Sequence, residues 1–312
     1  MTIPALHAPP RGKVAAIAAC AALLILFAII SYSAVLSKSA TYDEPLHAVA
    51  GFVHLVTGDF RINPEDPALF GYWGALPHSR NELSLDLNSP SWGKMIADTA
   101  SNQWPFVVDT LYHTPGTDAD AFLNKSRMMF IIVGVALGAL TAIWSWQLAG
   151  IAAAVIATAF FALDPNFMAH TALVKNDVML SFFMAGLAMA LWRFGRRGTW
   201  PSLVAIALCC AAAVNVKFSG LLCGPIIFLV LIFRALLPQT WIVVGRTLST
   251  RWRRMIVAPM VCIVVVIVSF IAIWACYGFR FSPTSDPNVS LNTQRVVLRA
   301  KISKLMAANA NA

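Results

Sequence analysis

Two adjacent carboxylates, Asp43 and Glu44, stand at the start of the only long polar segment in an otherwise apolar chain. They follow directly on a hydrophobic run, so both should lie within a few residues of a membrane surface. Acidic side chains at that depth are costly and usually serve a function. Neighbouring side chains on a helix diverge by about 100°, so this pair is poorly arranged as a general acid and a general base. A single base with a helper fits better.

Three further charged residues are expected at the same depth, because each lies at the outer end of a predicted span: Arg127, Asp177 and Lys217. If the topology holds, they gather with the carboxylates around one cavity, as expected for a substrate site at a membrane surface. The alternative is that each is an interfacial anchor. That alternative suits the long basic side chains better than Asp177 and Asp43, which gain nothing from reaching toward the headgroups.

A carboxylate beside cations suits transfer of a sugar from a lipid phosphate. The phosphate leaving group needs positive charge, which Arg127 or Lys217 can supply. The acceptor hydroxyl needs one base, whereas a glycosidase needs two carboxyl groups at a set separation. His47 and His54 are seven residues apart and make a divalent metal an alternative. We expect them to be interfacial hydrogen-bonding groups, with no metal.

The composition identifies a polytopic membrane protein. Of 312 residues, 59% are hydrophobic and 12% charged, whereas soluble domains carry about 25% charged residues. The net charge of +9 comes largely from bases in short loops between apolar runs, which is topogenic charge and not a nucleic-acid surface. The six cysteines lie in or beside apolar runs and form no disulfide framework.

Seven apolar runs predict transmembrane helices, for which about 20 residues are needed. Arg11 and Lys13 place residues 1–13 in the cytoplasm, and bases mark the later cytoplasmic turns. A signal peptide is the alternative for the first run, which is longer than the usual hydrophobic core of such peptides. The third and fifth runs are short. The predicted spans are 14–36, 128–148, 151–163, 177–194, 200–214, 219–236 and 256–277.

The loop 37–124 is therefore expected outside, as is the tail 278–312. Apolar residues recur at three- and four-residue steps from Asp43 to Thr57, which predicts an amphipathic helix in the interface plane. Gly58 ends it. We expect the rest of the loop to form short helices on the membrane surface, with the indoles in the headgroup layer; these are Trp73, Trp92 and Trp104.

Three stretches of the chain, 41–69, 169–192 and 215–225, resemble the membrane glycosyltransferases of the GT-C class. The resemblance is to the superfamily of dolichyl-phosphate-mannose protein mannosyltransferases and lipid A aminoarabinose transferases. The first stretch, TYDEPLHAVAGFVHLVTGDFRINPEDPAL, carries the Asp-Glu pair, the amphipathic helix and a proline-rich end. The others place an Asp at the start of the fourth span and a Lys between the fifth and sixth. The implied fold is an all-α GT-C-like bundle over residues 14–277.

The resemblance implies that Asp43 is the catalytic base with Glu44 beside it. It implies that Arg127 and Lys217 contact the lipid phosphate of the donor and that Asp177 belongs to the site. The implied reaction is inverting transfer from a polyprenyl-phosphate sugar to a protein, lipid or glycan acceptor, on the periplasmic side of a bacterial inner membrane. The implied partners are membrane lipids, this donor and the acceptor, with no nucleic acid and no firmly implied cofactor.

Two departures leave alternatives open. The family usually has His-Pro-Pro-Leu where this chain has Asp66-Pro67-Ala68-Leu69, so any contact made by that histidine is in doubt. Family members are also longer, so we expect a fragment, or a module that needs a partner for its missing helices. A non-catalytic scaffold or lipid-binding subunit is the alternative function. A secondary transporter fits less well, because it predicts charges near mid-span.

Overall fold

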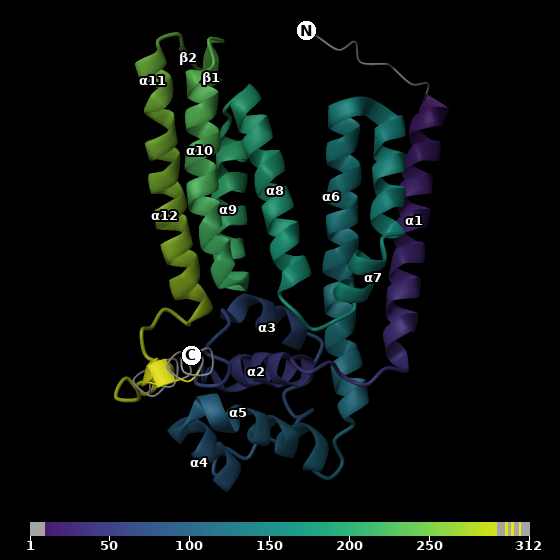
Figure 1. Cartoon of the computed structure of the whole chain (residues 1–312), viewed down its shortest axis with the longest axis vertical. Helices are drawn as coiled ribbons and strands as arrows, with labels where there is room; N and C mark the ends of the chain where they lie inside the picture. Colours follow the sequence, from purple (N-terminus) through teal and green to yellow (C-terminus); the bar gives the residue numbers. More distant parts are fainter. Residues whose placement is uncertain (1–9, 292–296, 299–300, 303–305, 307–312) are drawn as a thin grey trace.

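The computed structural model describes residues 10–291 together with 297–298, 301–302 and 306. Apolar helices run side by side as a bundle, and a group of short helices, here called the cap, covers one end of it (Figure 1). Within the described residues the only strands form one two-stranded sheet. The prediction of an all-α polytopic membrane protein is confirmed.

The bundle contains α1 (Pro10–Leu36), α6 (Ala119–Ala162), α8 (Asp177–Arg196), α10 (Cys223–Leu236) and α12 (Val257–Cys276). The 3₁₀ turn η2 (Phe218–Leu222) leads into α10, and α11 (Arg251–Met255) leads into α12. With these lead-ins, five helices among the described residues are long and apolar enough to cross a membrane. The 17-residue α9 (Trp200–Val216) is apolar but shorter.

Helix α6 is folded back on itself at Gly150, where the backbone has φ 84° and ψ −168°. Figure 1 shows its two arms joined at the end away from the cap. The predicted second and third spans are these two arms. The second arm, 151–162, is only about 18 Å long at 1.5 Å per residue, less than a bilayer core of about 30 Å. The first arm begins at Ala119, well before the predicted start, and therefore extends into the cap.

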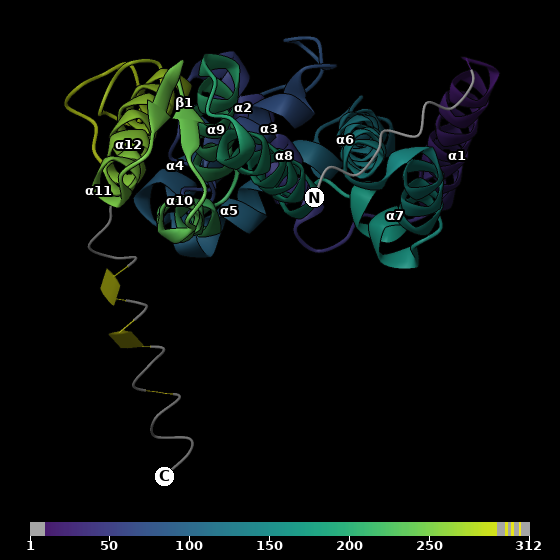
Figure 2. The ribbon, with the colours of Figure 1, turned by 90° about the horizontal axis from the view of Figure 1, so that it is seen from above.

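The helices form two groups. Figure 2 shows α1, α6 and α7 (Pro165–Thr171) on one side and α8 to α12 on the other. Contacts between α6 and α8 join the groups, while α9 packs against both α8 and α12. The connection from α7 to α8 and the turn from α9 to η2 both lie at the cap end, so each presents its polar residues there.

The cap is built from α2 (Glu44–Thr57), α3 (Ala68–Ala75), α4 (Pro90–Ala97), α5 (Thr99–Val108) and the π-helical turn η1 (Asp109–His113). Figure 1 shows α2 and α3 next to the bundle and α4 and α5 beyond them. The predicted helix α2 is confirmed, and it ends at Gly58, whose φ of 66° suits glycine. Gly51 of α2 lies against the backbone of Gly71 in α3, where no side chain fits.

Helix α2 packs between other helices of the cap and the bundle. Every residue of α2 from Glu44 to His54 is buried. Trp92 is 3% exposed in the cap core, Trp73 donates its indole N–H to the carbonyl of Met129 at 2.7 Å, and Trp104 packs on Tyr42. These indoles therefore pack against protein, where the cap can bury them and satisfy a buried N–H; that they lie at the depth of the headgroups stays a prediction.

The opposite end of the bundle is basic. It carries the hairpin of β1 (Trp241–Val243) and β2 (Arg246–Leu248), and the short helix α11. Arg254 is 5% exposed there and donates to the carbonyls of Ala235, Pro238, Gln239 and Ser249. After α12 the chain enters the cap, where Pro283 accepts a hydrogen bond from the N–H of Phe60 at 2.8 Å. Residues 280–283 of the predicted tail thus pack on the cap; part of the tail lies outside the described residues.

Candidate functional site

A polar hollow of about 290 Å³ opens where the cap meets the bundle. Five segments form it: the start of α2, the loop after α2, α5, the connection from α7 to α8, and the turn after α9. It is lined by Asp43, Leu46, His47, Asn63, Glu65, Asp66, Trp104, Lys175, Asn176, Asp177 and Lys217.

Asp43 stands immediately before α2 with its carboxylate half-exposed, at 46%. Its backbone is helical, so its side chain makes no capping hydrogen bond to the helix. The nearest cation is Lys175, whose Nζ lies 3.7 Å from Oδ2. A carboxylate that is accessible and held by only one long ion pair remains available to accept a proton.

Asp177 and Lys217 are in direct contact across the hollow. Lys217 follows the last residue of α9 and donates from Nζ to Oδ1 of Asp177, the first residue of α8. Both side chains are partly exposed, at 35% for Lys217 and 52% for Asp177. The predicted co-location of Asp43, Asp177 and Lys217 is therefore present in the structure.

Glu44 and Arg127 lie elsewhere, in a buried ion pair. The Glu44 carboxylate is inaccessible to solvent and Arg127 is 2% exposed. Nε and Nη2 of Arg127 donate to the two oxygens of Glu44, each at 2.9 Å. Glu44 also accepts the backbone N–H of Thr41 at 2.8 Å and of Val174 at 3.1 Å. Burial acts to raise the pKa of Glu44, but the hydrogen bonds from Arg127 and these N–H groups outweigh it and hold the pKa below its ordinary value.

The prediction that Arg127 contacts the donor phosphate does not fit this geometry. Its remaining N–H groups donate to the carbonyls of Val35, Lys38 and Ser39 and to the side chain of Asn124. No donor faces the hollow. The pair instead joins the end of α1, the start of α2, the first arm of α6 and the segment before α8.

An ion pair between His47 and Asp66 forms part of the hollow. The sequence did not predict this pair. Nε2 of His47 lies 3.2 Å from Oδ2 of Asp66, and Nδ1 lies 2.8 Å from the carbonyl of Val174. A carbonyl only accepts, so Nδ1 carries a proton, and the carboxylate favours a second proton on Nε2. Asn176 donates to Oδ1 of Asp66 at 2.8 Å. The spacing of His47 four residues after Asp43 was the available signal.

The pKa values of this pair move apart. Burial acts to lower the pKa of His47, but the hydrogen bond and charge of Asp66, the Val174 carbonyl and Asp43 outweigh it and raise the pKa. Burial acts to raise the pKa of Asp66, but His47, Asn63 and Lys217 outweigh it and lower that pKa. The raised pKa of His47 favours its charged imidazolium form beside the two lysines.

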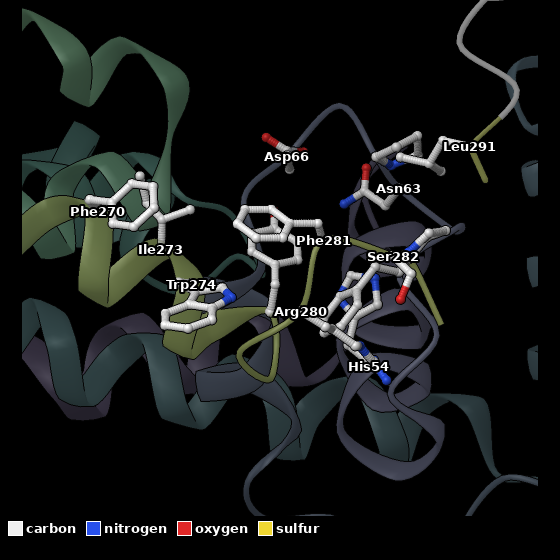
Figure 3. Close-up of a pocket in the computed structure, with 14 residues that line it drawn as sticks. His54, Asn63, Asp66, Phe270, Ile273, Trp274, Arg280, Phe281, Ser282 and Leu291 are labelled. Atoms are coloured by element: carbon white, nitrogen blue, oxygen red, sulfur yellow. The ribbon is translucent and has the colours of Figure 1, made fainter. Parts of the chain in front are cut away.

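A second hollow, of about 300 Å³, adjoins the first and shares Asn63 and Asp66 with it. The close-up in Figure 3 shows Phe270 and Trp274 of α12 on one side and His54 on the other, with Phe281 between them. The rings of Trp274 and Phe281 stack with centroids 6.2 Å apart. We call it the aromatic hollow.

His54 lines the aromatic hollow and has no part in the polar one. Its Nε2 donates to the carbonyl of Ile62 at 3.0 Å, and burial lowers its pKa to about 4. His54 is thus neutral, while His47 is paired with Asp66, so the two histidines do not converge on one ligand position.

These features define a class of multi-pass membrane proteins whose polar site lies at one end of the helical bundle, where a lipid-borne group and a water-soluble group can meet. A family model described as dolichyl-phosphate-mannose-protein mannosyltransferase matches residues 79–284. Because this match spans well over half of the chain, the chain belongs to that family of membrane glycosyltransferases, which use lipid-linked sugars. No curated protein and no solved structure matches the chain.

The matched segment contains three residues of the polar hollow that carry charge, Lys175, Asp177 and Lys217. It begins after the stretch that supplies Asp43 and Asp66. The family match therefore covers only the side of the hollow with the two lysines. The structure places the side with Asp43 and Asp66 next to it.

Proposed function

We propose that the protein transfers a sugar from a polyprenyl-phosphate donor to an acceptor hydroxyl, with inversion at the anomeric carbon and with Asp43 as the general base. The observation that carries this proposal is the position of the Asp43 carboxylate. It is accessible, accepts no capping hydrogen bond from the N–H groups of its helix, and faces the same hollow as Lys175 and Lys217.

In the proposed step, Asp43 takes the proton of the acceptor hydroxyl as its oxygen attacks the anomeric carbon. The bond from that carbon to the phosphate oxygen breaks, and the lipid phosphate leaves with the electron pair. A single displacement of this kind inverts the configuration. One base is sufficient because the phosphate needs no proton to leave.

Lys175 and Lys217 supply the positive charge that the departing phosphate requires. Arg127 is unsuited to this role because all of its donors are engaged within the protein. Asp177 holds the Lys217 ammonium at the hollow. Lys175 lies beside Asp43. Inversion places the base and the leaving phosphate on opposite faces of the anomeric carbon, so in the proposed step the long Lys175 side chain turns from Asp43 toward the phosphate.

The aromatic hollow would hold the first isoprenoid units of the donor. It lies at the end of α12 next to the polar hollow, and the two share a wall of Asn63 and Asp66. A donor with its phosphate at the lysines can extend past this wall onto Trp274 and Phe281. Aromatic and aliphatic walls of this kind favour an isoprenoid through the burial of apolar surface.

The orientation follows from charge. The end of the bundle opposite the cap carries Arg193, Arg196 and Arg197 and the arginines of the hairpin and α11. By the positive-inside rule this end faces the cytoplasm. The cap and both hollows then face the outer side, which in a bacterial inner membrane is the periplasm.

The test is transfer by the purified chain from a polyprenyl-phosphate sugar to a panel of protein, lipid and glycan acceptors. The proposal predicts release of free polyprenyl phosphate that depends on the acceptor. Donor binding without release by the wild-type chain across the panel would instead support the non-catalytic lipid-binding subunit.

A further inference from the structure

The largest of the described hollows lies away from the proposed site, at the basic end of the bundle. It has a volume of about 570 Å³ and lies between α8 and α10. Its walls are apolar, with Leu187 and Leu191 from α8 and Ile226, Val230 and Phe233 from α10. Phe233 is 66% exposed, so the hollow opens at the side of the bundle, where we expect the hydrocarbon of the bilayer.

Two arginines stand at the mouth of this hollow. Arg196 is exposed at the end of α8, and its guanidinium lies 5.1 Å from the centre of the Trp192 ring. Among the described residues it has no hydrogen-bond or ion-pair partner. Arg234 is fixed by a 2.7 Å hydrogen bond from Nε to the carbonyl of Gly195 and by stacking on Trp241 at 5.0 Å.

No carboxylate neutralises these charges. The sequence contains no Asp or Glu between Asp177 and Asp286, and Asp177 itself lies at the cap end of α8. The mouth of the hollow is therefore purely cationic, while its interior is apolar. A ligand that complements both parts has a negative head and a hydrocarbon chain.

We propose that this hollow binds an anionic phospholipid of the adjacent leaflet. One acyl chain fills the hollow between α8 and α10, and the headgroup phosphate contacts Arg196 and Arg234. The free guanidinium of Arg196, oriented by Trp192, donates to the phosphate oxygens, and Arg234 contributes a fixed positive charge. This site is independent of the proposed transfer reaction.

Topogenic charge accounts for arginines at this end of the bundle but predicts nothing about their positions. Under that explanation every exposed arginine here attracts anionic lipid equally. The proposed site predicts that Arg196 matters more than an exposed arginine outside the hollow. Arg253 of α11 is such a residue, since it is exposed and does not line the hollow.

The experiment measures binding of dioleoyl-phosphatidylglycerol and dioleoyl-phosphatidylcholine to the detergent-purified chain by native mass spectrometry. We expect a retained phosphatidylglycerol and weaker retention of phosphatidylcholine. Arg196→Gln should weaken phosphatidylglycerol binding about fivefold, the effect of one lost basic contact near a lipid surface, and Arg253→Gln should weaken it less than twofold. Ala188→Phe, at an exposed position that lines the hollow, should remove the retained lipid by filling its place.

Equal weakening by Arg196→Gln and Arg253→Gln would overturn the proposal in favour of general surface charge. Equal retention of the two lipids by the wild-type chain would also overturn it. If Ala188→Phe elutes as the wild-type chain does, the variant is folded. If it does not fold, the comparison of the two arginine variants decides alone.

Discussion

Arg127 and Glu44 are joined by two parallel hydrogen bonds of 2.9 Å in a region closed to solvent. Glu44 directly follows Asp43, and Val174, whose N–H binds Glu44, directly precedes Lys175. The ion pair therefore fixes the backbone beside the proposed base and beside one of the proposed phosphate ligands. We infer a positioning role for both residues.

Arg127→Ala should destabilise the fold, because it leaves the Glu44 carboxylate buried and uncompensated. The expected cost is about 3–5 kcal/mol, as for other broken buried pairs. Thermal unfolding in detergent measures it. Arg127→Lys should restore little, since an ammonium cannot form the paired hydrogen bonds.

A folded Arg127→Ala chain with wild-type stability but much weaker donor binding would contradict this role. That result would return Arg127 to the phosphate site that the resemblance implied. Arg80, which is exposed, provides the matched control, and Arg80→Ala should change neither stability nor binding.

Lys175→Ala and Lys217→Ala should each weaken binding of polyprenyl phosphate by about 10- to 100-fold, the range for a lost charge-assisted hydrogen bond. Titration of the purified variants with that lipid tests this. Lys94→Ala, at an exposed position of the cap, should bind as the wild type does. Unchanged binding in both hollow variants would place the phosphate elsewhere.

The His47–Asp66 ion pair should make the stability of the cap depend on pH. The pKa of His47 is raised in the folded chain, so its contribution is complete below the ordinary value of about 6.5 and is lost as the pH rises through the folded value. The pKa of Asp66 is lowered, so its contribution is present above about 3.9 and is lost as the pH falls through the folded value.

The measurement is the unfolding temperature from pH 5 to pH 9 for the wild type and for His47→Gln. We expect stability to fall on the alkaline side in the wild type, and the variant to lack this fall. His113→Gln is the control, because the imidazole of His113 is 68% exposed. A fall of the same size in His47→Gln would show that another group titrates.

Trp274→Ala should raise the KM for long-chain donors about tenfold, through loss of apolar contact in the aromatic hollow. A donor with a single isoprenoid unit should be affected far less if the chain leaves the phosphate before reaching Trp274. Steady-state kinetics with both donors provides the comparison. Trp252→Ala, with an indole 71% exposed at the opposite end, should behave as the wild type; equal effects on both donors would place the isoprenoid outside this hollow.

Much of the fold could be predicted because the signals are local. Apolar runs located the bundle helices, and the three- and four-residue steps after Asp43 located α2. The environment of α2 could not be predicted in the same way. A helix with one strongly apolar face can lie on a membrane or pack within a cap, and its burial depends on α3 to α5, whose sequences carry weaker patterns.

The site could be predicted where the depth of a residue along the bundle is enough to place it. Asp43, Asp177 and Lys217 each lie at the outer end of a helix, so topology alone brings them to one layer. Whether a charge at that depth faces a hollow or a buried partner depends on the direction of its side chain, which the sequence does not give for Arg127. Lys175 lies within the stretch 169–192 that resembles the family, but no spacing or motif singles it out. Asp66 is distinguished only because it stands where the family usually has a histidine.

The most direct test of the central claim compares Asp43→Asn with Asp120→Asn, an exposed acid at the start of α6. The readout is acceptor-dependent release of polyprenyl phosphate from the donor, alongside donor binding and unfolding temperature. Asp43→Asn should lose at least about 100-fold in the rate, as for removal of a general base, while donor binding and stability remain. Asp120→Asn should keep the full rate. Transfer at the wild-type rate by folded Asp43→Asn would contradict the assignment of Asp43 as the base.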